Sequence, residues 1–208
     1  GEGKVGGIAI PWEIQAEGAA PVCKSGVKMK GIVFCEFVEL MEQKFSADMA
    51  DEVISGTELE SGGAYTAVGT YDHHEMLALV TQLSEKTGTP VPELVKAFGQ
   101  YLFGRFVELY PAFFEGVEGA FSFLDRIEEH VHVEVKKLYP DAELPTFKTS
   151  HPDAETMIMV YQSRRPFADL ALGLIEGCIT HYGEQVDVGM EDLSDEGRTH
   201  VRFTLKRQ

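Results

Sequence analysis

Apolar residues recur at helical spacing over four stretches of the chain. The first stretch follows Met29, where glutamates separate apolar residues that lie three and four positions apart (Ile32, Val33, Phe37, Leu40 and Met41). The second follows Tyr71, and its Asp72 and Glu75 fit a capping box before a stop at Gly88. The third follows Pro92 and stops before Tyr110, and it carries Leu94, Val95, Phe98, Leu102 and Phe106. The fourth runs from Phe121 to Leu138 and ends at Pro140. These stretches predict four helices, and we expect a further short helix over 113–117.

The second half of the chain changes to a period of two. Thr156 to Arg165 alternates, which predicts a strand, and a helical pattern over 167–182 follows it. Strands are predicted over 185–190 and 200–207, joined as a hairpin by the acidic turn around Asp195. Helices therefore come first and an antiparallel sheet with one inserted helix comes last, which predicts an α+β fold.

Composition separates a leader from a folded domain. Residues 1–28 are rich in Gly, Ala and Pro, so we expect them to be a leader before a single domain over 29–208: a disordered extension, an upstream mis-start or a cloning remnant. The formal charge of −16 repels phosphate backbones and anionic headgroups, which argues against nucleic acid and membrane partners. No signal peptide or spanning segment is visible, so we expect a cytoplasmic protein. The three cysteines, Cys23, Cys35 and Cys178, fit neither a disulfide framework nor a CxxC motif.

Two features could carry chemistry. His132 lies at the margin of the apolar stripe, where an imidazole could reach a cavity and ligate haem iron, although a lone histidine is more often an ordinary residue. The alternation places Tyr161, Ser163 and Arg165 on one strand face. Two hydroxyls and a guanidinium suit a pair of carboxylates such as haem propionates, whereas the simpler interpretation is a solvated edge strand.

Taken together, these residues resemble one family. Met29-Lys30-Gly31 is followed by His132 seven positions before Tyr139-Pro140, then by Pro145 and by Tyr161-x-Ser163-x-Arg165. The chain resembles the H-NOX (haem nitric oxide/oxygen binding, HNOB) family, related to the haem domain of soluble guanylate cyclase, from Met29 nearly to the C-terminus. The resemblance implies a helical lobe and a sheet lobe that hold a haem between them.

The resemblance also implies the role of each site residue. His132 would be the proximal iron ligand, Tyr161, Ser163 and Arg165 would bind the propionates, and Pro145 would press on the porphyrin. Because no CxxCH motif is present, the cofactor would be non-covalent haem b (iron protoporphyrin IX). Relatives with a zinc site use cysteines near the C-terminal hairpin, and only Cys178 lies in this half, so we expect no zinc.

The distal pocket predicts which gas is bound. Oxygen-binding members resemble one another in carrying a tyrosine nine residues beyond the motif tyrosine, where this chain has Leu170. The other positions that align near the distal face are also apolar: Val33, Phe37, Leu102 and Phe106. None of them can donate a hydrogen bond to bound oxygen, so we expect nitric oxide, with carbon monoxide as a further candidate ligand. An oxygen sensor is the alternative if another tyrosine turns inward.

The output is expected to pass to another protein. In the family, nitric oxide loosens the bond between the proximal histidine, here His132, and iron, and the helical lobe pivots. Because these residues show no kinase or cyclase pattern, we expect a separate partner such as a histidine kinase or a cyclic-dinucleotide enzyme. A haem enzyme would need a distal acid–base pair, which the aligned positions lack, so we expect no enzyme. A haem-free module of the vinyl-reductase type remains a second alternative, and Cys35 or Cys178 could be redox-active.

Overall fold

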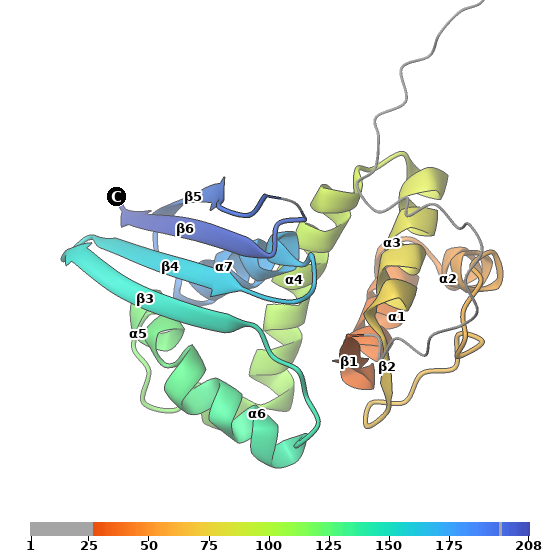
Figure 1. Ribbon diagram of the computed structural model, residues 1–208, viewed down its shortest axis with the longest axis horizontal. Helices are drawn as coiled ribbons and strands as arrows, with labels where there is room; N and C mark the ends of the chain where they lie inside the picture. The colour runs from red at the N-terminus through yellow and green to blue at the C-terminus, as the bar shows by residue number, and fades with distance from the viewer. Residues whose placement is uncertain (1–26, 196) are drawn as a thin grey trace, which may run out of the picture.

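Two lobes flank one long helix in this molecule. The computed structural model describes residues 27–195 and 197–208, so residues 1–26 of the predicted leader lie outside the described residues. The N-terminal lobe contains β1 (Lys28–Lys30), α1 (Gly31–Lys44), α2 (Ala47–Ser55), β2 (Thr70–Asp72) and α3 (His73–Thr87). The second lobe contains α5 (Ala120–Asp125), α6 (His132–Leu138), β3 (Thr146–Asp153), β4 (Thr156–Gln162), α7 (Ala168–Tyr182), β5 (Val186–Asp192) and β6 (His200–Arg207). Helix α4 (Val91–Leu109) runs between the lobes (Figure 1). The predicted α+β arrangement is confirmed.

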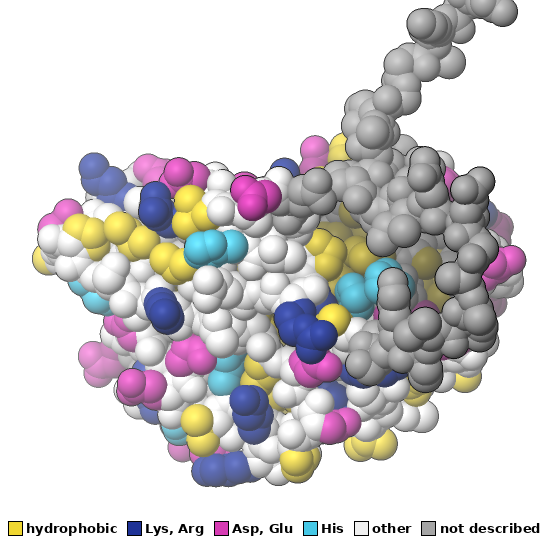
Figure 2. All heavy atoms as spheres, in the orientation of Figure 1, with side chains coloured by type: hydrophobic (Ala, Val, Ile, Leu, Met, Phe, Trp, Pro, Cys, Tyr) yellow, Lys and Arg dark blue, Asp and Glu magenta, His cyan; other side chains and the backbone are white. Residues whose placement is uncertain are grey.

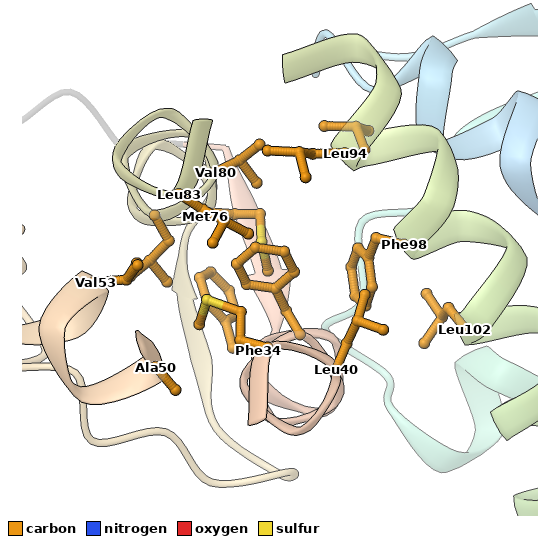
Figure 3. Packing of buried hydrophobic residues seen from close by; sticks show 14 of the residues in the cluster. Phe34, Leu40, Ala50, Val53, Met76, Val80, Leu83, Leu94, Phe98 and Leu102 are labelled. Atoms are coloured by element: carbon orange, nitrogen blue, oxygen red, sulfur yellow. The ribbon is translucent and has the colours of Figure 1, made fainter. Parts of the chain in front are cut away.

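The N-terminal lobe packs its helices around a core of aromatic and aliphatic side chains. Phe34 of α1 is fully buried, and Val53 of α2 and Met76 of α3 point into the same core, which Phe98 of α4 closes (Figure 3). The apolar stripes of the sequence form this core, because each helix can only remove its stripe from water against another helix. Helix α2 was not predicted from the sequence.

A two-stranded ribbon precedes the first helix. Met29 of β1 lies opposite Tyr71 of β2 in an antiparallel pair, so the helix begins at Gly31 rather than at Met29. An added Cβ at Gly31 would lie 1.9 Å from the carbonyl oxygen of Thr66. Only glycine therefore lets the start of α1 approach that loop so closely.

Helix α3 begins with half of the predicted capping box. The Asp72 carboxylate accepts a hydrogen bond from the His74 backbone N–H at 2.9 Å. Glu75 instead accepts hydrogen bonds from the hydroxyls of Ser61 at 2.5 Å and Tyr65 at 2.8 Å. The predicted reciprocal contact is thus replaced by one that holds the loop before β2 against α3.

The four-stranded sheet of the second lobe has the order β3-β4-β6-β5 and is antiparallel throughout. Met157, Met159 and Tyr161 alternate along β4 and are buried against α7, as the period of two predicts. The strand ends at Gln162, so Ser163 and Arg165 lie beyond it and not on the predicted strand face. β5 and β6 form the predicted hairpin. Strand β3 was not predicted, because its side chains are mostly exposed or half-buried and show no apolar alternation.

The longest predicted helix is interrupted. Between α5 and α6 the chain forms a π-helical segment, Ile127–Val131, in which the His132 N–H bonds to the Ile127 carbonyl. A π turn inserts an extra residue into the helix and is frequent at functional sites. The apolar stripe is preserved through this segment, which is why the sequence pattern does not reveal it.

One further prediction changes. The short helix predicted over 113–117 is wrong, because only a 3-10 turn forms, over Pro111–Phe113. Across the described part of the chain, no helix combines the length and the apolar character needed to cross a membrane. On the face shown in Figure 2, lysine and arginine side chains are scattered among aspartates and glutamates rather than gathered in one patch.

Helices α4 and α7 approach each other closely through glycines. An added Cβ at Gly173 of α7 would lie 2.0 Å from the Lys96 carbonyl oxygen of α4. An added Cβ at Gly99 of α4 would lie 2.4 Å from the Leu170 carbonyl oxygen. This backbone contact fixes α7, and therefore Leu170, against the helix that separates the lobes.

Candidate functional site

A cavity of about 260 Å³ lies where the two lobes and α4 meet. This volume is close to the lower end for pockets that bind small organic molecules, about 300 Å³. Most of its lining is aliphatic or aromatic and comes from β1, α1, α4, α6 and α7, and its polar lining residues include His132, Tyr161, Ser163 and Arg165. The cavity therefore brings together the four polar residues that the sequence predicted to bind haem.

His132 is positioned for metal ligation. It begins α6 directly after the π-helical segment, and its side chain is 15% exposed. Burial lowers the pKa of His132, although the Glu128 carboxylate beside it acts in the opposite direction. The ring is therefore neutral near pH 7, which is the form that ligates iron. Its Nδ1 lies 3.1 Å from Oε1 of Glu128, so Nε2 remains as the nitrogen that can take a ligand.

Tyr161, Ser163 and Arg165 line the cavity from the end of β4 and the segment after it. The Tyr161 hydroxyl donates to the Arg165 carbonyl oxygen at 3.4 Å, and burial raises the pKa of this phenol. The Ser163 hydroxyl accepts from the Arg165 backbone N–H at 3.0 Å. These local bonds hold the three residues in one compact turn.

Arg165 is a buried cation, with 8% of the residue exposed. Its guanidinium donates to the carbonyl oxygens of Lys28, at 3.0 Å, and Glu143. Within the described residues no carboxylate lies at ion-pair distance from it, and the Glu143 carboxylate is 3.6 Å from Arg164 instead. Burial lowers the pKa of Arg165 below its ordinary value. An unpaired buried charge is costly, so an anionic group in this cavity would fit the site.

Of the residues predicted to surround the gas or press on the porphyrin, all but one line the cavity. The lining includes Pro145, Val33, Leu102, Phe106 and Leu170. Phe37 does not line it, because its ring packs edge to face on Phe98, with 5.1 Å between the ring centres, in the core of the N-terminal lobe. Phe37 is thus the predicted distal residue that lies apart from the lining, on the α1 face that packs on α4.

Two tyrosines in the lining were missed from the sequence. The hydroxyls of Tyr110, at the end of α4, and Tyr139, at the end of α6, lie 3.2 Å apart. Burial and this neighbouring hydroxyl raise the pKa of Tyr110, so the phenol stays protonated. In the sequence, Tyr110-Pro111 marked only the end of a helix, and Tyr139-Pro140 entered the family motif without a role in the site.

A second histidine group lies outside the cavity. Among the described residues, Asp72, His73 and His74 have potential metal-ligand atoms within 4.8 Å of one another. His73 is buried, and its Nδ1 lies 2.9 Å from the Val27 carbonyl oxygen. Asp72 already accepts from the His74 backbone and lies 2.7 Å from the His74 ring. These contacts give the three residues a structural role at the start of α3.

Neither described cysteine resembles a reactive thiol. Cys178 is fully buried, and burial raises its pKa well above the ordinary value. Burial and the adjacent Glu36 raise the pKa of Cys35 as well. Because the thiolate is the reactive form, a raised pKa makes both thiols less reactive. The structure therefore favours inert cysteines.

Comparison with known proteins gives one consistent answer. The sequence model of the haem-NO-binding family (HNOB) matches residues 30–190. The Fe(II) unliganded H-NOX protein from K. algicida is 37% identical with a TM-score of 0.81, covering 86% of this chain and 97% of that chain. The IWP-051-bound H-NOX from Shewanella woodyi in the Fe(II)CO state is 39% identical with a TM-score of 0.75, covering 86% of this chain and 95% of that one.

A more distant relative shows the same fold. The H-NOX protein from S. oneidensis in the Fe(II)NO state is 22% identical with a TM-score of 0.80, covering 86% of this chain and 99% of that chain. No curated protein sequence gives a match. The family match, the lobed fold and the cavity with its histidine and buried arginine agree, and the chain belongs to the H-NOX (haem-NO-binding) family of haem-binding gas-sensor domains.

Proposed function

We propose that this domain binds haem b without a covalent link and senses nitric oxide. His132 ligates the iron, and Tyr161, Ser163 and Arg165 bind the propionates. The observation that carries the proposal is the buried guanidinium of Arg165, which has no carboxylate partner among the described residues and lines the same apolar cavity as a neutral imidazole. One cavity thus offers a metal ligand, apolar walls and a cation for carboxylates.

Each residue has a separate task in this proposal. The bound iron supplies the position at which a gas can coordinate. His132 presents Nε2 to that metal because Nδ1 is engaged by Glu128. Pro145 also lines the cavity, where it would lie against the porphyrin. His132 would hold the iron from α6, and because both lobes line the cavity, a change at His132 would bear on how the lobes meet.

The choice of nitric oxide rests on the apolar wall. Val33, Leu102, Phe106 and Leu170 line the cavity, and none can donate a side-chain hydrogen bond. Bound oxygen depends on such a donor, whereas nitric oxide and carbon monoxide do not. Support also comes from the relatives, one of which is in the Fe(II)CO state and another in the Fe(II)NO state.

Oxygen sensing is the second candidate, and Tyr110 is the observation that favours it. Tyr110 lines the cavity, although its hydroxyl lies 3.2 Å from the Tyr139 hydroxyl. If Tyr110 served bound oxygen, the ferrous protein would form a stable complex in air, and Tyr110→Phe would abolish that complex. We expect no such complex in either protein. Tyr139→Phe, which removes the partner hydroxyl, is the matched variant.

The output of the domain is proposed by analogy within the family. We propose that loosening of His132 is read in the cytoplasm by a separate protein, such as a histidine kinase or a cyclic-dinucleotide enzyme, and that the domain itself catalyses no reaction. The absence of a zinc site stays a prediction.

Replacement of the proposed iron ligand tests the cofactor site. The His132→Gly protein should purify without haem and regain it when imidazole is supplied, because the free ligand can occupy the space that the ring leaves. His130→Gly is the matched control, since His130 lies two residues away and does not line the cavity. Full haem retention by His132→Gly without imidazole would refute His132 as the ligand.

A further inference from the structure

Glu128 contacts the proposed iron ligand from the π-helical segment. Its Oε1 lies 3.1 Å from Nδ1 of His132, four residues further along the chain. The histidine side chain is 15% exposed and that of the glutamate is 36% exposed. The carboxylate is therefore partly screened by water, and the hydrogen bond that it accepts is itself partly buried.

The same carboxylate oxygen is fixed by a second bond. Oε1 of Glu128 accepts the backbone N–H of Phe147 at 2.6 Å. Phe147 lies in β3, and its ring centre is 6.0 Å from that of His132. The carboxylate thus joins the segment before α6 to the strand that follows Pro145. Because Oε1 accepts both bonds, the carboxylate cannot rotate away from the imidazole without breaking its bond to the sheet.

Only one assignment of donor and acceptor suits this hydrogen bond. An ionised carboxylate only accepts hydrogen bonds, so the proton of a neutral imidazole must reside on Nδ1, and Nε2 keeps its lone pair. A carboxylate partner on the remote nitrogen fixes the ring orientation and raises the basicity of the ligand. A neutral acceptor would orient the ring but would donate less electron density.

We propose that Glu128 is a positioning residue that fixes the His132 tautomer and makes this imidazole a more electron-rich, more tightly held iron ligand. The proposal rests on the proposed function, because it requires His132 to ligate haem iron. It adds that the carboxylate strengthens the bond between His132 and the iron. With a neutral residue at position 128, this bond would break more readily when nitric oxide binds.

The test compares Glu128→Gln with the wild-type ferrous haem protein. The amide oxygen of Gln can still accept from Phe147, so the substitution removes the charge and leaves the backbone contact. We expect the iron–histidine stretching frequency in resonance Raman spectra to fall and the midpoint reduction potential of the iron to rise. Glu128→Ala, which removes the acceptor altogether, should also weaken haem retention by about 10- to 100-fold.

Glu129→Gln is the matched control. Glu129 is exposed, lies on the same π-helical segment and has the same charge, yet it makes no hydrogen bond with His132 in the described structure. A general change in net charge would affect both variants equally. Only Glu128→Gln should change the stretching frequency and the potential.

The possible failures are distinguishable. If His132→Gly keeps its haem without imidazole, the proposed function fails and the role of Glu128 fails with it. If His132→Gly behaves as expected but Glu128→Gln and Glu129→Gln both match the wild type in frequency and potential, the haem site stands and the role of Glu128 is refuted.

Discussion

Arg165 connects three segments that are far apart in the sequence. Its guanidinium bonds to the carbonyl oxygens of Lys28 in β1 and Glu143 after α6, while its backbone bonds to Ser163. Carbonyl oxygens satisfy the N–H donors but do not neutralise the charge. The residue therefore combines a structural contact between the lobes with the capacity to bind an anion.

Removal of this guanidinium should weaken haem retention. A hydrogen bond to a charged group contributes about 1.5–3 kcal/mol, so Arg165→Ala should release haem about tenfold faster or more. The measurement is the rate of haem transfer to excess apomyoglobin.

Arg164→Ala is the control for that experiment, because Arg164 is the neighbouring residue and its side chain is 73% exposed. Equal transfer rates for the two variants and the wild type would contradict a propionate role for Arg165.

At the scale of elements, the contact between α4 and α7 is limited by backbone atoms. An added methyl at Gly173 meets the Lys96 carbonyl oxygen at 2.0 Å, which forces the two helices apart. We expect Gly173→Ala to lower the free energy of unfolding by about 1–3 kcal/mol, the usual cost of overpacking. Urea denaturation followed by circular dichroism measures this change.

Gly104 on α4 gives a control of opposite sign. An added Cβ there meets nothing within 4 Å. Gly104→Ala should therefore stabilise the protein by about 0.5–1 kcal/mol through the lower entropy of the unfolded chain. A loss of stability in Gly104→Ala equal to that in Gly173→Ala would show that close packing is not the cause.

His73, at the start of α3, should make the stability of the protein depend on pH. Burial lowers the pKa of His73 below its ordinary 6.5, and the nearby positive charges of His74 and Arg165 act in the same direction. The unfolded chain consequently binds the proton more readily than the folded one. The contribution of neutral His73 is complete above about pH 6.5 and is lost as the pH falls toward the folded pKa.

The variant His73→Asn should therefore show a smaller loss of stability than the wild type between pH 7 and pH 5. Asn keeps an N–H donor for the Val27 carbonyl but does not titrate. Thermal melts across this range measure the difference, with the exposed His74→Asn as control. Parallel pH profiles for wild type and His73→Asn would contradict the argument.

Much of the fold could be predicted from the sequence where burial is periodic. The stripe of α4 and the alternation of Met157, Met159 and Tyr161 follow directly from which side chains leave water. β3 could not be predicted, because it lies at the edge of the sheet and its exposed side chains carry no apolar period. The π turn before His132 could not be predicted for a related reason, since it changes backbone hydrogen bonds without changing the apolar stripe.

Part of the candidate site could also be predicted from the sequence. His132 and Arg165 stood out by residue type and by a spaced motif, but their contacts depend on the tertiary fold. Phe37 was placed in the distal pocket because helical spacing alone does not say which neighbour an apolar face meets. Glu128 could have been found from its spacing of four residues before His132, which places both side chains on one helical face.

At the scale of the whole molecule, two lobes share one cavity whose walls come from both. A ligand at that place contacts β1, α1, α4, α6 and α7 at once, so a change at His132 can alter how the lobes meet. We propose that this cavity holds haem through His132 and responds to nitric oxide rather than oxygen.

The most direct measurement is the absorption spectrum of the ferrous protein under nitrogen, in air and with nitric oxide. We expect a haem spectrum that changes on addition of nitric oxide and shows no stable oxygen complex in air. A protein that binds no haem, or a ferrous protein that forms a stable oxygen complex in air, would contradict it.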